Sequence, residues 1–184
     1  DGSGKSTWTK KLGCELSRRG LNVALIGVDQ WHQPRSSRFS EHLPSEHFYQ
    51  HAFRWDELFN QLILPLKCFR NIYLPVQLYR IEHDEPYPHT YFFRNIDVIL
   101  LEGIFLLKKE FRQYYDQAVW IDCSFETALE RALQRNQEGL TQAEMIREYN
   151  TIYFPAQKLH FERDAPQLHA EIRLQSELLL EQAR

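Results

Sequence analysis

The chain has 184 residues, a length that fits one α/β domain of ordinary size. Hydrophobic residues make up 43% and charged residues 26%, which excludes a disordered chain and a coiled coil. The formal net charge of -3 argues against nucleic acid as the main partner. Three cysteines without a C-x-x-C spacing favour a reducing, cytoplasmic setting, and the most apolar stretch, 96–107, is too short to span a membrane.

The first half of the sequence alternates predicted helices with a short apolar strand. Apolar residues at helical spacing predict helices over 5–19 and 55–66, and the run 23–26 predicts a buried strand. The stretch 30–54 is polar, aromatic and rich in histidine, without a clear period. We expect loops there, lying over a site.

The second half continues this alternation. Residues 72–81 predict a strand region around Pro75, and Pro86 and Pro88 predict a loop after it. The later predicted elements are strands over 98–101 and 119–121, a helix over 125–135 capped by Ser124, a helix from the capping box at Thr141 toward Ile152, a helix beginning at Pro155, and a strand over 170–174. Strands alternating with helices predict a single α/β domain over 1–184, with a mainly parallel sheet flanked by helices.

The most specific motif lies at the start of the sequence. Gly4-Lys5-Ser6 ends the phosphate-loop pattern G-x-x-x-x-G-K-[ST] and leads into the first predicted helix. Backbone N–H groups and the helix N-terminus would bind an anion, Lys5 can reach the β- and γ-phosphates, and the Ser6 hydroxyl is placed for Mg²⁺. We predict a site for ATP or GTP with Mg²⁺; the alternative is a glycine-rich turn capped by serine. The predicted nucleotide-binding residues are Gly2, Ser3, Gly4, Lys5, Ser6 and Thr7.

Two acidic residues follow predicted strands. Glu102 comes directly after the strand 98–101, where a carboxylate is costly to bury without a cation or donor, so we predict that it joins Ser6 at the metal. Asp29 ends the strand region that begins at Val23, at the edge where open α/β sheets bind ligands. It could take the proton of a substrate hydroxyl. The alternative for both acids is a helix or turn cap near the surface.

Several segments, in order, resemble the uridine kinase-like branch of the P-loop kinases over most of the chain. The most specific are the phosphate loop and the segment from Ile99 to Leu106. The Glu102-Gly103 ending favours this branch over the thymidylate kinases, which share the loop. The other segments are Gly27-Val28-Asp29, Pro34-Arg35, Arg38-Phe39, Phe48-Tyr49, Arg131 with Arg135, Tyr149 with Tyr153-Phe154-Pro155, and Pro166 with Ala170.

The resemblance implies ATP- or GTP-dependent phosphorylation of a nucleoside 5′-hydroxyl, with uridine or cytidine as the first expectation. It implies that Asp29 is the base, that Lys5 contacts the phosphates, and that a lid over about 131–150 begins with Arg131 and Arg135. These two arginines would neutralise the transferring phosphoryl group; without the resemblance, they would more often form a solvated helix face.

An acceptor pocket is predicted from polar and aromatic residues around the Asp29 segment, since aromatic faces could stack on a base and polar groups could hold hydroxyls. Loop residues that face water are the alternative. The residues are His32, Arg35, Arg38, Tyr49, Tyr79 and His83. His47 and His51 have one-turn spacing, which alone is a weak zinc signal.

Departures from the resemblance fall in the acceptor region and the lid. Arg54 stands where an acid often follows the Phe, Gln30-Trp31-His32 replaces a Ser-Phe-Tyr-like run, and Ala132 replaces a lid arginine. Arginines 35, 38 and 54 could grip a phosphate or carboxylate, which would make the acceptor a nucleotide or another metabolite. A P-loop module that hydrolyses nucleotide to switch a partner is the other alternative. Homo-oligomer formation is left open.

The sequence begins inside the phosphate-loop motif. The first Gly of the motif is absent, as is the strand that leads into the loop in P-loop kinases. We expect about 15–30 further residues before Asp1, enough for a strand and its approach.

Overall fold

The computed structural model describes residues 2–81, 83–135 and 139–176, so Asp1 of the predicted phosphate loop lies outside them. The chain forms two compact units. One unit comprises 6–38 and 52–103; the other comprises 1–5, 39–51 and 104–184. Each unit is α/β, and among the described residues no helix has the length and apolar character needed to cross a membrane.

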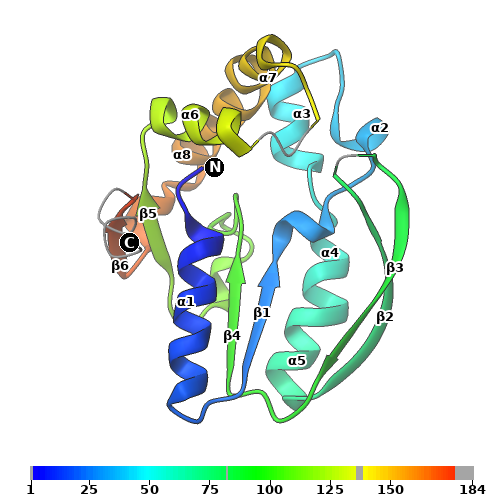
Figure 1. Cartoon of the computed structure of the whole chain (residues 1–184), viewed down its shortest axis with the longest axis vertical. Helices are drawn as coiled ribbons and strands as arrows, with labels where there is room; N and C mark the ends of the chain where they lie inside the picture. The colour runs from blue at the N-terminus through cyan, green and yellow to red at the C-terminus, as the bar shows by residue number, and fades with distance from the viewer. Residues whose placement is uncertain (1, 82, 136–138, 177–184) are drawn as a thin grey trace. The chain divides into compact units, whose positions relative to one another are not determined.

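A parallel pair of strands is the centre of the first unit. β1 (Val23–Gly27) pairs with β4 (Val98–Glu102), with Val23 opposite Val98 and Gly27 opposite Glu102. α1 (Lys5–Arg18) runs beside this pair (Figure 1) and presents Gly13 to Leu25 of β1. The helical segment after residue 54 consists of α4 (Trp55–Glu57), η2 (Leu58–Ile63) and α5 (Leu64–Phe69). The helices predicted over 5–19 and 55–66 are confirmed.

The two apolar strands differ in burial from the prediction. In β1, Ala24 and Ile26 are buried, whereas Leu25 between them is 43% exposed. In β4, all five residues are half-buried. Successive side chains of a strand point to opposite faces. Only the face of β1 that carries Ala24 and Ile26 is therefore buried in the interior of the unit.

The loop predicted at Pro86 and Pro88 is wrong, because both residues lie in a strand. β2 (Ile72–Tyr79) and β3 (Pro86–Phe93) form an antiparallel hairpin, seen as a long ribbon in Figure 1. Proline lacks a backbone N–H and is tolerated only at strand edges. In a two-stranded ribbon both strands are edges, so the prolines can leave the inter-strand hydrogen bonds intact.

The expectation of loops throughout 30–54 is also only partly met. The stretch contains η1 (Val28–Trp31), α2 (Arg35–Arg38) and α3 (Pro44–His51). α3 belongs to the second unit and buries Phe48 and Tyr49. Two buried aromatic residues next to each other give no helical period, which is why α3 escaped prediction.

The second unit combines a short parallel sheet with packed helices. β5 (Val119–Asp122) pairs with β6 (Ile172–Gln175), and η3 (Arg112–Tyr114) precedes the sheet. The remaining elements are α6 (Phe125–Arg135), α7 (Gln142–Glu148), η4 (Tyr149–Tyr153), α8 (Phe154–Asp164) and η5 (Pro166–His169). The caps predicted at Ser124 and Thr141 are confirmed: the Ser124 hydroxyl accepts from the Thr127 amide at 3.0 Å, and Thr141 forms a capping box with Glu144.

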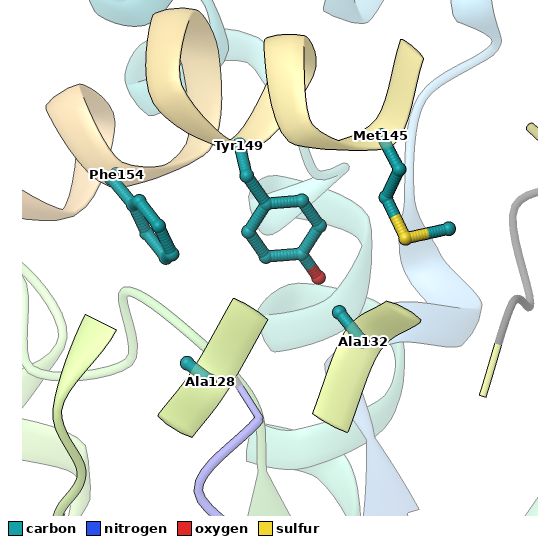
Figure 2. Close-up of a cluster of buried hydrophobic side chains, with 5 residues drawn as sticks. All are labelled: Ala128, Ala132, Met145, Tyr149 and Phe154. Atoms are coloured by element: carbon teal, nitrogen blue, oxygen red, sulfur yellow. The ribbon is translucent and has the colours of Figure 1, made fainter. Parts of the chain in front are cut away.

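A small apolar cluster joins these helices. Figure 2 shows Met145, Tyr149 and Phe154 pointing toward Ala128 and Ala132 of α6. Ala132 is only 1% exposed. An arginine at this position would place a charge in the helix–helix contact, which gives a physical reason for the alanine that replaces a lid arginine.

A close backbone approach at Gly103 predicts a measurable stability difference. A Cβ on Gly103 would lie 2.6 Å from the Cβ of Val28, a stiff β-branched residue. We expect Gly103→Ala to lower the free energy of unfolding by about 1–3 kcal/mol, measured by urea denaturation. Gly13→Ala is the control: its Cβ would meet only the end of the movable Leu25 side chain, at 2.9 Å. Equal losses for both variants would contradict the prediction.

Candidate functional site

The phosphate loop has the backbone geometry of an anion cradle. Gly2 and Gly4 have φ of +63° and +87°, in the left-handed region that favours glycine. Lys5 and Ser6 are the first two residues of α1, and the first turn of this helix contains no acidic residue. The positive end of α1 is therefore not neutralised by its own side chains and can attract phosphate. Of the other loop residues, Ser3 is buried and Thr7 is exposed.

Helix α6 packs directly on the start of this loop. A Cβ on Gly2 would lie 2.6 Å from Ala128 Cα, so the contact requires glycine. Arg131 Nη1 donates to the Gly2 carbonyl at 2.8 Å and to the Ser176 hydroxyl at 3.1 Å. Arg131 thus holds the loop backbone. Arg135 lies exposed at the end of α6; part of the predicted lid, 136–138, lies outside the described residues.

The two predicted strand-end acids lie at the same edge of the β1·β4 pair. Gly27 is opposite Glu102, and Asp29 follows two residues later on η1. Asp29 is exposed, whereas Glu102 is half-buried. A Cβ on Gly27 would lie 3.2 Å from Glu102 Oε1, so the missing side chain leaves room for the carboxylate. The exposed carboxylate of Asp29 suits proton transfer, and the half-buried carboxylate of Glu102 suits binding of a cation.

The residues predicted to bind metal have the oxygen donors that Mg²⁺ takes. Ser6 offers a hydroxyl and Glu102 a carboxylate, and both belong to the first unit. Within 2–81, 83–135 and 139–176, no three His, Cys, Asp or Glu side chains cluster as a dedicated metal cage. Mg²⁺ usually keeps several waters and uses one or two protein ligands with substrate phosphates. Ser6 and Glu102 fit that pattern and would hold the ion.

A buried aromatic cluster follows Asp29. The Trp31 and Tyr91 rings stack with centroids 5.8 Å apart. Trp31 Nε1 donates to the Tyr91 hydroxyl at 3.0 Å, and this hydroxyl donates to Gln30 Oε1 at 3.0 Å. Burial raises the pKa of Tyr91 to about 12, so the hydroxyl keeps its proton at neutral pH. This chain of hydrogen bonds holds Gln30 and Trp31 in place, and Tyr91 was not predicted from the sequence.

Two polar side chains sit against this cluster. His32 is 2% exposed, and its Nδ1 lies 2.8 Å from the Asp29 carbonyl oxygen. The Arg54 side chain is 10% exposed; its guanidinium lies 5.3 Å from the Trp31 ring centroid and 5.7 Å from that of Tyr79. Arg54 Nη1 donates to Glu57 Oε2 at 3.1 Å.

A sequence model of the phosphoribulokinase/uridine kinase family matches residues 1–158. The chain belongs to this family. Membership confirms the resemblance, the α/β P-loop kinase fold and the phosphotransferase class. A kinase of this family binds a nucleoside triphosphate and acts on a small molecule.

Solved structures similar to this family member cover nearly its whole length. A possible uridine kinase from Bacillus stearothermophilus is 25% identical, with a TM-score of 0.74, over 94% of this chain and 82% of that one. A candidate fructose transport system kinase from Silicibacter sp. TM1040 is 17% identical, with a TM-score of 0.68, over 95% of this chain and 84% of that one. The second likeness supports the fold alone. No curated protein matched the sequence.

In this family member, the predicted acceptor residues are divided between the units. His32, Arg35, Arg38, Tyr79 and His83 belong to the first unit, and Tyr49 to the second. Arg38 is buried, Tyr79 is half-buried, and Arg35 and His83 are exposed. The Arg35 amide donates to both Asp84 carboxylate oxygens at 2.8 Å. Their acceptor roles stay predictions.

Tyr49 takes part in a buried network that the sequence did not reveal. Its hydroxyl donates to Asp164 Oδ2 at 2.5 Å, and His160 Nδ1 lies 2.7 Å from the same oxygen. The Lys109 amide donates to Asp164 Oδ1 at 3.1 Å, and Lys108 Nζ donates to the Tyr49 carbonyl at 2.7 Å. Burial would raise the pKa of Asp164, but the hydrogen bonds from Tyr49, His160 and the Lys109 amide hold it below its usual range.

Proposed function

We propose that this kinase transfers the γ-phosphoryl group of ATP to a hydroxyl of a small metabolite, with Asp29 as the general base. The observation that carries this proposal is the pairing of Gly27 with Glu102. Through this pairing, Asp29 and Glu102 both lie at the carboxyl end of the parallel pair β1·β4. Ligands of open α/β sheets bind at this edge. Family membership supplies the reaction class.

In the proposed reaction, the Asp29 carboxylate takes the proton of the acceptor hydroxyl. The oxygen forms a bond to the γ-phosphorus while the bond from phosphorus to the β–γ bridging oxygen breaks, and ADP leaves. Lys5 and the loop amides hold the phosphate oxygens. Bound Mg²⁺ would neutralise charge on the β- and γ-phosphates, and Ser6 and Glu102 would position it. Positioning and charge neutralisation supply most of the rate.

Uridine or cytidine remains the first acceptor to test. Its support is the likeness to a possible uridine kinase, which reaches 25% identity over most of both chains. A panel of nucleosides, nucleoside monophosphates, pantothenate and glycerate, read by ADP release, tests the kinase function. Stimulation by one acceptor supports it; ADP release that no acceptor stimulates contradicts it.

Lys5→Ala should weaken both nucleotide binding and turnover. Losing one phosphate contact is expected to lower kcat by about 10²–10³-fold, since such donors act where charge develops. Calorimetry with ATP and ADP release with the best acceptor measure the two effects. Lys10→Ala, at an exposed position on α1, is the control. Equal effects of the two variants would count against a phosphate role for Lys5.

A further inference from the structure

Backbone pairing brings Arg54 next to the Asp29 segment. His32 and Phe53 form an isolated antiparallel bridge. On either side, the Arg54 amide donates to the Trp31 carbonyl at 2.8 Å and the Gln33 amide to the Ala52 carbonyl at 2.9 Å. The position of Arg54 is therefore set by main-chain hydrogen bonds, close to the proposed base.

The Arg54 guanidinium has one edge without hydrogen-bond partners. Nη1 is held by Glu57, whereas Nε and Nη2 are buried and have no partner among the described residues. Nε–H and Nη2–H point the same way and form the fork that binds two oxygens of one carboxylate or phosphate. The Trp31 and Tyr79 ring faces attract the charge but provide no oxygen acceptor. The hydrogen-bonding geometry of this unpartnered edge matches an oxyanion.

His32 presents a complementary acceptor. The Asp29 carbonyl can only accept, so His32 Nδ1 carries the hydrogen of their 2.8 Å contact. Burial lowers the pKa of His32, so the ring is neutral at pH 7 and Nε2 has a lone pair. Nε2 is buried without a partner among the described residues. A ligand hydroxyl could donate to His32 Nε2, and His32 follows Asp29 by three residues in the chain.

Hydrogen bonds satisfy several polar groups near Arg54 and His32. Trp31 Nε1, the Tyr91 hydroxyl and Gln30 Oε1 form a continuous chain, and Asp84 accepts from the Arg35 amide. Buried polar groups without hydrogen-bond partners, here Arg54 Nε and Nη2 and His32 Nε2, commonly mark a functional role.

We infer that the phosphate acceptor carries an oxyanion, a carboxylate or phosphate monoester that binds the Nε/Nη2 edge of Arg54, and a hydroxyl that donates to His32 Nε2. Hydroxy acids and sugar phosphates fit this description, whereas neutral uridine and cytidine do not. The inference rests on the proposed kinase function and narrows its substrate class.

Matched acceptor pairs test the inference through kcat/KM for ADP release: glycerate against glycerol, ribose 5-phosphate against ribose, and UMP against uridine. We expect the best anionic acceptor to exceed its neutral partner by about tenfold or more, as a charge-assisted bidentate contact would give. Arg54→Gln should lower kcat/KM for the anionic acceptor much more than for its neutral partner, and so remove most of this preference. Arg54→Lys keeps the charge but loses the fork, and should also lose most of the preference. The first two pairs distinguish a carboxylate from a phosphate.

Arg94→Gln is the matched control, because Arg94 also lies over an aromatic ring, Phe92, but follows the other end of the β2–β3 hairpin. A neutral acceptor used as well as its anionic partner would overturn the inference, as would equal losses on both in Arg54→Gln. Calorimetry with glycerate and ribose 5-phosphate separates this result from failure of the kinase function. Binding that Arg54→Gln and Arg54→Lys both weaken, without any turnover, would support the anion site and contradict the kinase; no binding and no turnover would contradict both.

Discussion

Asp29→Asn is expected to lower kcat by about 10²–10⁴-fold, the usual contribution of a general base, while ATP binding stays unchanged. The amide has the size of the carboxylate but cannot take the proton of the acceptor hydroxyl. Asp29 is exposed on η1, just after β1, so the substitution removes no buried carboxylate. ADP release at saturating acceptor measures kcat, and calorimetry measures ATP affinity.

The matched control for this variant is Asp56→Asn. Asp56 is also an exposed acid, but it lies in the first turn of α4. Its amide variant should turn over at the wild-type rate. Normal turnover by Asp29→Asn would show that another group accepts the proton, whereas loss of ATP binding would show that the substitution disturbs the phosphate site.

Asp164→Asn is expected to lower the free energy of unfolding by about 3–5 kcal/mol, because it breaks a buried charged network. Asp164 is 3% exposed and accepts from Tyr49, His160 and the Lys109 amide. An asparagine has only one oxygen and would point an N–H₂ group at a donor. Urea denaturation at pH 7 measures the loss, with Asp56→Asn as an exposed control expected to stay within about 0.5 kcal/mol of wild type. A loss for Asp164→Asn no larger than that control would contradict the network's role.

The same network predicts loss of stability in acid. Burial lowers the pKa of His160, so as pH falls below about 6.5 the unfolded chain gains a proton that the folded chain resists. The pKa of Asp164 is also lowered, so its contribution is complete above its ordinary value and disappears as pH falls through the folded value. Unfolding free energy should therefore fall from pH 7 to pH 5 and fall further below pH 4. His160→Gln should reduce the loss between pH 7 and pH 5, to which the buried His32 also contributes, and Asp164→Asn should reduce the loss below pH 4.

Signals that are local in sequence predicted much of the fold and part of the site. The phosphate loop, the Ser124 cap and the Thr141 capping box each depend on residues within one or two turns, so their chemistry is visible in a short window. Asp29 and Glu102 were found for a related reason. Each follows a short apolar run, and parallel pairing then brings the two strand ends to one edge.

Features that depend on distant residues were not predictable. The Tyr49–Asp164 hydrogen bond joins positions 115 residues apart, and Trp31 meets Tyr91 across 60 residues. The β2–β3 hairpin was not predicted because Pro86 and Pro88 favour a loop. Proline is tolerated in this strand because both strands of the hairpin are edge strands. Arg54 was noticed as a departure from the family pattern, but its backbone contact with Trp31 and the unpartnered edge of its guanidinium are visible only in the folded chain.

The most direct test of the central proposal is to follow the γ-phosphoryl group of radiolabelled ATP in the presence of the acceptor panel. Chromatography of the products separates labelled acceptor from labelled inorganic phosphate. A hydroxyl kinase predicts label on one acceptor, at a rate that Asp29→Asn lowers by about 10²–10⁴-fold. Label found only in inorganic phosphate, at the same rate with and without every acceptor, would contradict phosphoryl transfer to a hydroxyl.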